Sequence, residues 1–191
     1  MPRAGLTAER LTTAAAELAD AEGLEAVSVA ALARRFGVRP ASLYSHVAGT
    51  EALRVRVALL ALEEMADLAV DAVAGRSGRD ALAALADVYR DYARAHPGRY
   101  DAAQLRLDPD TAAGSAGPRH AALNRAVLRG YRLGEPDETH AVRIIGAAVH
   151  GFVRLEASGG FDHSRPSPTS TWTRVVDALD TLFTTWSRST S

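Results

Sequence analysis

The chain has 191 residues, of which 47% are hydrophobic and 24% are charged, and its formal net charge is −1. This composition argues against an intrinsically disordered chain, and the near-neutral charge argues against a protein that coats nucleic acid without sequence preference. The sequence has no cysteine and no apolar run as long as a membrane span, so we expect a cytoplasmic protein without disulfides, thiolate metal sites or membrane partners.

Apolar residues recur at helical spacing along the whole chain, and no stretch alternates with the period of a strand, so the sequence predicts an all-α fold. The first helix is expected over 7–23. A second opens after Ser28, a favourable N-cap, and ends at the glycine of residue 37. A third begins at Pro40, the residue type favoured at the first helical position, and ends before residue 49.

The remaining helices are longer. Thr50 is expected to cap a helix over 51–73, which the glycines between 75 and 78 interrupt. Further helices are expected over 79–95, 118–133 and 136–158, and after a Pro-, Ser- and Thr-rich loop at 163–170. Residues 98–117 carry no clear periodicity and are left unassigned.

Residues 28–47 form the most informative pattern. A short helix, a tight turn at Gly37 and a second short helix are the parts of a helix-turn-helix, whose second helix enters the major groove of DNA. With Leu43 and Val47 facing the core, the helical repeat turns the intervening side chains toward solvent. The sequence therefore predicts a DNA-facing surface made of Ala41, Ser42, Tyr44 and Ser45.

The same part of the chain resembles the TetR family of one-component regulators, over about the first sixty residues. The matching segments are Val27-Ser28-Val29-Ala30-Ala31-Leu32-Ala33-Arg34-Arg35-Phe36-Gly37-Val38 and Arg39-Pro40-Ala41-Ser42-Leu43-Tyr44-Ser45-His46-Val47. The resemblance implies that Tyr44 and His46 grip DNA phosphates and that Ser28 adds a phosphate contact at its helix N-terminus. The side chains it places near the base edges are those of Arg39, Ala41, Ser42 and Ser45.

The chain departs from the family after the recognition helix. The family usually has a lysine there, whereas this sequence has Gly49-Thr50-Glu51. We expect Thr50 to contact phosphate through its hydroxyl and the helix N-terminus behind it, with weakened DNA binding as the result. The nearby positive charge then rests on Arg34, Arg35 and Arg39.

The segment from Val149 to Glu156, followed by Gly159-Gly160-Phe161, resembles the TetR-type regulators named for a Trp-His-Gly motif, with Val149 in place of the tryptophan. The resemblance implies a DNA-binding domain at 1–50 and a ligand-binding and dimerisation domain at 51–191. Its last two helices would pair across a two-fold axis through Val149, Phe152, Val175, Leu179, Leu182 and Trp186. Candidate contacts to a small molecule are Tyr89, Tyr92, Asn124 and His150, within a wider set that adds His96, Tyr100, Gln104 and His120.

These observations favour a homodimeric repressor that binds double-stranded operator DNA with a palindromic sequence and is released by a small molecule, with no cofactor or metal. An alternative is a helical small-molecule-binding protein whose DNA-binding module is degenerate. An enzyme is the less favoured alternative, because the sequence has no Gly-x-Ser-x-Gly elbow, no phosphate-cradling glycine-rich loop and no His-Glu-x-x-His pair. A mobility-shift assay on DNA flanking the gene separates these hypotheses.

Overall fold

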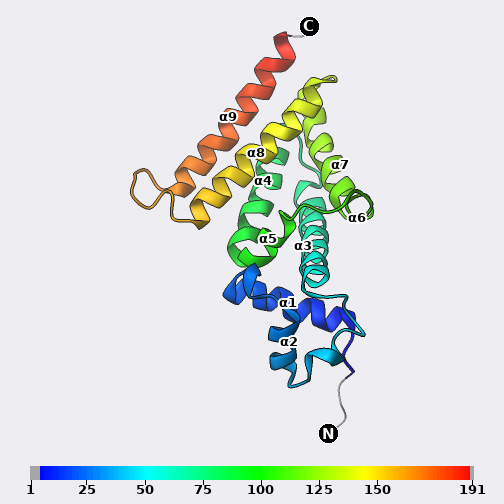
Figure 1. Ribbon diagram of the computed structural model, residues 1–191. Helices are drawn as coiled ribbons and strands as arrows, with labels where there is room; N and C mark the ends of the chain where they lie inside the picture. Colours follow the sequence, from blue (N-terminus) through cyan, green and yellow to red (C-terminus); the bar gives the residue numbers. More distant parts are fainter. Residues whose placement is uncertain (1–4, 190–191) are drawn as a thin grey trace. The chain divides into compact units, whose positions relative to one another are not determined.

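The computed structural model describes residues 5–189, and Figure 1 shows their course. Every regular element in this range is a helix, which confirms the predicted all-α class. None of the described helices is both long and apolar enough to span a membrane. The α-helices are α1 (Ala8–Glu22), α2 (Val29–Phe36), α3 (Thr50–Val73), α4 (Gly78–Ala95), α5 (Pro97–Ala103), α6 (Pro109–Ala113), α7 (Gly117–Leu128), α8 (Asp137–Ala157) and α9 (Pro168–Ser189). Three short 3-10 segments are η1 (Leu24–Ala26), η2 (Pro40–Ser42) and η3 (Arg129–Tyr131).

Capping residues determine where the first two helices begin and where α2 ends. The Thr7 hydroxyl caps α1 by accepting a hydrogen bond from the backbone N–H of Arg10 at 3.2 Å. The Ser28 hydroxyl caps α2 in the same way, accepting from the N–H of Ala31 at 3.1 Å. Gly37 ends α2 in the left-handed conformation, with φ at 65°, which only glycine adopts without steric cost.

The third predicted helix is shorter than expected. Only η2 is regular, and the chain continues through hydrogen-bonded turns to residue 46. The amides of Leu43 and His46 donate three residues back, to Pro40 at 3.0 Å and to Leu43 at 2.9 Å, whereas Val47 donates four residues back, to Leu43 at 3.0 Å, so the segment is mostly tighter than an α-helix. The predicted facing still holds, because Leu43 and Val47 are buried.

The predicted cap of α3 is wrong. The helix includes Thr50, and the carbonyl of Gly49 accepts the first helical hydrogen bond, from Leu53 N–H at 3.1 Å. The Thr50 hydroxyl accepts instead from the backbone N–H of Val29 at 3.3 Å. It therefore joins the starts of α2 and α3 rather than capping its own helix.

The contacts divide the chain into two compact units that differ from the predicted boundary at residue 50. The first unit, here called the reading unit, holds the residues up to Glu64 together with Ala95–Ala116. The second, here called the core unit, holds Met65–Arg94 and the residues from Gly117 onward. The physical reason is that the segment 95–116, which carried no sequence periodicity, packs into the reading unit.

Helix α5 joins α1 at an unusually close approach. A Cβ on buried Gly98 would collide with the backbone carbonyl of Ala19, so only glycine fits. The carboxylate of Asp20 accepts from the Arg99 backbone N–H at 2.9 Å and lies 3.0 Å from the Arg99 guanidinium. The Arg99 guanidinium also pairs with Glu64 of α3 at 3.1 Å. Apolar packing also holds α5 in place, because Ala102 belongs to the same buried cluster as the residues of α1 and α2.

In the core unit, α7 packs beside α8 and α8 beside α9 (Figure 1). A buried cation ties α4 to the last two helices. Arg90 is only 4% exposed and forms two hydrogen bonds to the Glu156 carboxylate, at 3.0 and 2.6 Å. Its guanidinium lies beside two rings that contact each other, 5.5 Å from the centroid of Phe152 and 5.1 Å from that of Trp172. The Trp172 indole N–H in turn donates to Asp87 of α4 at 2.6 Å.

Candidate nucleic-acid interface and buried polar cluster

The turn after α2 presents the predicted DNA-facing residues to solvent. Tyr44 is 59% exposed, although tyrosine rings are often at least partly buried. The adjacent small residues are exposed as well. Leu43 and Val47 are buried within the same turn and anchor it to α1 and α2. The residues that this arrangement leaves exposed are Arg39, Ala41, Ser42, Tyr44 and Ser45, while His46 is half-buried.

Three of the hydroxyl groups in and near this turn have intramolecular partners, those of Ser28, Ser45 and Thr50. Ser45 donates to the carbonyl of Ser42 at 3.1 Å. The oxygens of Ser28 and Thr50 each accept from a backbone amide of α2, as described above. A hydroxyl that accepts one hydrogen bond keeps its own hydrogen for another acceptor. Ser28 and Thr50 are both half-buried, and they lie at the starts of α2 and α3, where helix dipoles favour anions.

The arginines of this region differ in their roles. Arg35 pairs with Glu17 and donates to the Ala14 carbonyl at 3.3 Å, so it braces α2 against α1 instead of adding free positive charge. Arg34 and Arg39 are exposed. Sequence reasoning missed Arg56, an exposed cation on α3 that acts together with His46 on the carboxylate of Glu9 and lowers its pKa, after the larger effects of the Glu9 backbone and of Thr7. The sequence signal for Arg56 is a cation in the second turn of the helix that follows the exposed turn at 39–46, here called the recognition turn.

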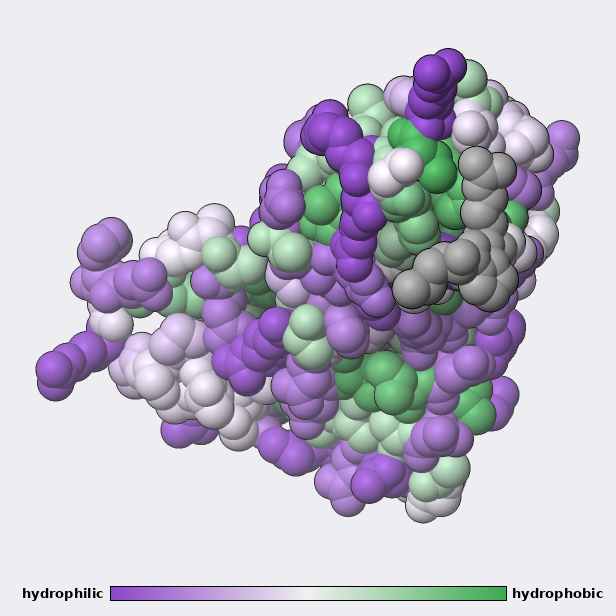
Figure 2. Space-filling model, turned by 90° about the horizontal axis from the view of Figure 1, so that it is seen from below, coloured by the Kyte–Doolittle hydropathy of each residue, from purple (hydrophilic) through white to green (hydrophobic). Residues whose placement is uncertain are grey.

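Hydrophilic residues cover most of the face seen in Figure 2, and hydrophobic residues gather in separate patches on it. A polar surface of this kind fits the character of DNA-contacting surfaces, which are more polar than protein–protein interfaces. Within the part of the chain that the structure describes, no group of three or more His, Asp or Glu side chains is arranged to hold a metal ion.

The core unit contains a buried polar cluster, defined here by Tyr89 of α4, His120 and Asn124 of α7, and His150 of α8. The Tyr89 hydroxyl and the His120 Nδ1 lie 2.8 Å apart, in hydrogen-bonding distance. The Tyr89 ring centroid lies 5.7 Å from that of His120 and 5.8 Å from that of His150. Asn124 donates its side-chain N–H to the carbonyl of His120 at 2.9 Å. Three helices thus place four hydrogen-bonding side chains together.

Burial changes the acid–base behaviour of this cluster. It raises the pKa of Tyr89 to about 12, against a smaller opposite effect of its hydrogen bond with Asn124. Burial also lowers the pKa of His150, and the neighbouring His120 lowers it further. Tyr89 and His150 are therefore uncharged at neutral pH. Of the predicted ligand contacts, Tyr92 is buried three residues further along α4.

The predicted dimer residues divide into two groups. Val149, Phe152 and Leu179 are 1%, 6% and 6% exposed within the single chain, so they leave little surface for contact with a second copy. These residues belong to the faces of α8 and α9 that are buried inside the core unit. Leu182 is exposed, and Val175 and Trp186 are half-buried.

Other predicted residues lie in the reading unit. His96, one of the wider set of candidate ligand contacts, precedes α5 and places its Nδ1 3.2 Å from the Asp20 carboxylate. Tyr100 is buried, and Gln104 is exposed at the end of α5. These three candidates therefore belong to the reading unit, whereas the four residues of the buried polar cluster belong to the core unit.

Comparison with known proteins gives matches along most of the chain. Residues 11–57 match the sequence profile described as "Bacterial regulatory proteins, tetR family", and residues 82–179 match "Tetracyclin repressor-like, C-terminal domain". The uncharacterized HTH-type transcriptional regulator YobS of Bacillus subtilis is 35% identical over 161 residues, which is 84% of this chain and 84% of that protein. The HTH-type transcriptional regulator Rv0681 of Mycobacterium tuberculosis is also 35% identical, over 83% of this chain and 74% of its own.

Solved structures share the fold at low sequence identity. A protein of unknown function from Rhodococcus superposes with a TM-score of 0.73 at 23% identity, over 96% of both chains. The TetR family protein ActR of Streptomyces coelicolor, in complex with (S)-DNPA, superposes with a TM-score of 0.69 at 17% identity, over 96% of this chain and 100% of that one.

Proposed function

This chain belongs to the TetR family of bacterial helix-turn-helix transcriptional regulators, and we propose that it is a homodimeric repressor that a small molecule releases from a palindromic operator. The observation that carries the proposal is the exposed turn at 39–45 held by buried Leu43 and Val47. A short, rigid and polar projection of this kind fits the major groove of DNA. Such a regulator acts in the cytoplasm, where the chromosome lies.

We assign different roles to the side chains of the turn. Tyr44 and His46, with the hydroxyls of Ser28 and Thr50, contact phosphates and position the protein without selecting a sequence. Arg39 reaches a base edge, for which a guanine is the best partner of a guanidinium, and the small side chains Ala41, Ser42 and Ser45 let the backbone approach the bases. Arg56 is an exposed long cation in the second turn of α3, and so offsets the loss of the family's lysine near residue 50.

Replacing Tyr44 with alanine is expected to weaken binding to operator DNA and to random DNA by the same factor, about tenfold at constant salt. The reason is that a dimer loses a phosphate hydrogen bond at each half-site, and each bond contributes about 0.5–1.5 kcal/mol. Fluorescence anisotropy with labelled DNA flanking the gene measures both affinities. Tyr44→Phe is the matched variant, because it keeps the ring and loses only the hydroxyl.

Two results would contradict this assignment. If Tyr44→Ala reduced affinity for the operator alone, the side chain would read bases instead of phosphates. If the wild-type chain bound no DNA from its own locus at all, the alternative of a small-molecule-binding protein with a degenerate DNA-binding module would take the place of the repressor.

The dimer surface that we propose lies on the exposed faces of α8 and α9. Small exposed residues, Ala147 and Gly151 on α8 and Ala178 on α9, permit close approach of a second copy. Two large apolar side chains are exposed on the same two helices, Leu155 at 52% and Leu182 at 42%. A two-fold axis through this surface would set two recognition turns on successive major grooves, which requires a palindromic operator.

Leu182→Glu is expected to produce monomers that no longer bind the operator. A carboxylate inside an apolar interface loses its solvation and finds no partner there, and a single half-site binds weakly. Analytical ultracentrifugation measures the assembly state. Leu68→Glu is the matched control, because Leu68 is 50% exposed on α3 and lies outside the proposed interface. A Leu182→Glu protein that remained dimeric would move the interface to another face.

The buried polar cluster is the proposed effector site. Tyr89, Asn124 and His150 offer neutral hydrogen-bonding groups within an apolar surrounding, which is how small-molecule sites orient their ligands. An effector that binds the free protein better than the DNA-bound protein lowers operator affinity, and operator DNA must then lower effector affinity by the same factor. ActR, a protein of the same family, was solved in complex with (S)-DNPA, which supports the assignment of a small-molecule site to this fold.

A further inference from the structure

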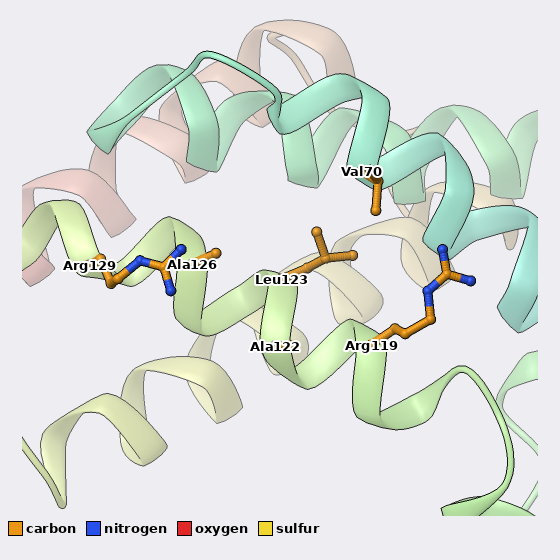
Figure 3. Close-up of a pocket in the computed structure, with 6 residues that line it drawn as sticks. All are labelled: Val70, Arg119, Ala122, Leu123, Ala126 and Arg129. Carbon is orange, nitrogen blue, oxygen red and sulfur yellow. The ribbon is translucent and has the colours of Figure 1, made fainter.

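A second candidate site lies in a groove between α3 and α7, within the core unit. The groove has a volume of about 380 Å³. Its lining residues are Val70, Arg119, Ala122, Leu123, Ala126 and Arg129. Figure 3 shows Val70 and Leu123 directed toward one another, with the two arginines at opposite ends. The groove is thus an aliphatic strip with a cation at either end.

The two arginines differ in charge compensation. The Arg119 guanidinium lies 2.6 Å from the carboxylate of Asp67, so its charge is already balanced. Arg129 has no carboxylate within ion-pairing distance among the described residues, and its side chain is exposed. One end of the groove therefore carries an uncompensated positive charge, whereas the other end is neutral overall.

The residues on the floor of the groove limit which kinds of ligand can bind there. Its four residues between the arginines are alanine, leucine and valine, none of which donates or accepts a hydrogen bond through its side chain. Val70 is 44% exposed, which leaves an aliphatic surface in contact with water. Arg119 and Arg129 are ten residues apart, which corresponds to roughly 15 Å along a helix axis. These dimensions suit a linear aliphatic chain, and the volume is at the lower end of the range for small-molecule sites.

We propose that this groove binds a medium-chain aliphatic carboxylate, with its chain along Val70 and Leu123 and its carboxylate on Arg129. The planar guanidinium matches a carboxylate through two parallel hydrogen bonds. The groove is distinct from the buried polar cluster, because successive residues of α7 point about 100° apart: Arg119 and Leu123 face the groove, whereas His120 and Asn124 face α4. Ligand binding at the groove does not depend on operator recognition.

The test uses the full chain and dodecanoate below its micelle-forming concentration, measured by isothermal titration calorimetry. Dodecanoate is expected to bind at least tenfold more tightly than dodecanol and than dodecyltrimethylammonium, which share the chain but lack the negative charge. Arg129→Gln should weaken dodecanoate binding about tenfold and leave dodecanol unaffected. Leu123→Gln, which adds a polar group to the floor, should weaken both.

Arg125→Gln is the matched control, because Arg125 is an exposed arginine of α7 that does not line the groove, and it should bind dodecanoate like the wild type. Equal affinity for the anionic and the uncharged probe, or wild-type binding by Arg129→Gln, would overturn the proposal. So would a loss of binding in Tyr89→Phe without one in Arg129→Gln, since the probe would then occupy the buried polar cluster. Vesicles of phosphatidylglycerol serve as a second anionic source, and binding to vesicles but not to dodecanoate would also overturn it.

Discussion

Replacing Arg90 with methionine is expected to destabilise the protein by about 3 kcal/mol, as happens when one partner of a buried ion pair is removed. Methionine replaces the arginine beside Phe152 and Trp172, but the carboxylate of Glu156 then loses two hydrogen bonds from a guanidinium that is 4% exposed. Arg94 still reaches the same carboxylate at 3.0 Å, which keeps the loss near the lower end of the range for such pairs. Urea unfolding at one fixed protein concentration, followed by circular dichroism, measures the change.

Arg94→Met is the matched control for this experiment. It removes a partner of the same carboxylate from the same helix, but the Arg94 side chain is 49% exposed, so solvent screens the pair and the loss should stay below about 1 kcal/mol. The double variant Arg90→Met with Glu156→Met should recover part of the stability lost by Arg90→Met, because neither charge is then left unpaired. A single Arg90→Met variant as stable as the wild type would contradict the role given to this arginine.

Acid titration offers a second readout of the same contact. The hydrogen bond from Arg90 is the main reason that the pKa of Glu156 is held below its ordinary value of 4.5. A carboxyl group with a lowered pKa in the folded state contributes stability above its ordinary pKa, and that contribution disappears as the pH falls through the folded pKa. The wild type should therefore lose more stability on acidification below pH 4.5 than Arg90→Met does.

Gly98→Ala is expected to destabilise the reading unit by about 3 kcal/mol, at the upper end of the usual cost of overpacking. The added Cβ collides with the backbone of α1 at Ala19, and a backbone atom cannot move aside as the end of a flexible side chain can. Separation of α5 from α1 also stretches the hydrogen bond from Arg99 N–H to Asp20. Because α1 supports the recognition turn, operator affinity should fall in parallel with the midpoint of urea unfolding.

Gly114→Ala is the matched control, because it lies in the same segment and a Cβ there meets its nearest neighbour at an ordinary 3.5 Å. Its backbone φ of −84° suits any residue, so stability should change by less than about 0.5 kcal/mol. Wild-type stability in Gly98→Ala would mean that α1 and α5 do not approach as closely as the structure indicates.

The sequence was sufficient to predict where the recognition segment begins and which residues it buries, although it predicted a longer helix than the 3-10 segment and turns observed. Ser28, Gly37 and Pro40 each have one strong local preference, and the two buried positions Leu43 and Val47 follow from helical spacing. Local signals of this kind need no knowledge of distant residues. Local signals did not predict the role of Thr50. Its hydroxyl accepts a hydrogen bond from the amide of Val29, 21 residues away, instead of capping the start of its own helix.

Long-range packing explains what the sequence did not predict. Helices α5 and α6 have seven and five residues, too few to show a periodic apolar face, and α5 is held by tertiary contacts to Asp20 and Glu64. On α8 and α9 the apolar spacing was visible, but spacing alone does not tell an internal stripe from an intersubunit one. Leu179 therefore proved to be part of the protomer core, whereas Leu182 is exposed.

The return of residues 95–116 to the reading unit limits how the protein can be divided and recombined. A fragment ending near residue 64 would carry the recognition turn but lack Gly98, Arg99 and Ala102. The apolar surface of α1 that α5 covers would then be exposed to solvent. Exchange of effector specificity between relatives therefore requires three crossovers, after residues 64, 94 and 116, rather than one. A chimera joined only after residue 64 would combine an α1 from one parent with an α5 from the other, and its solubility would depend on whether the foreign α5 has a glycine at the position that meets residue 19.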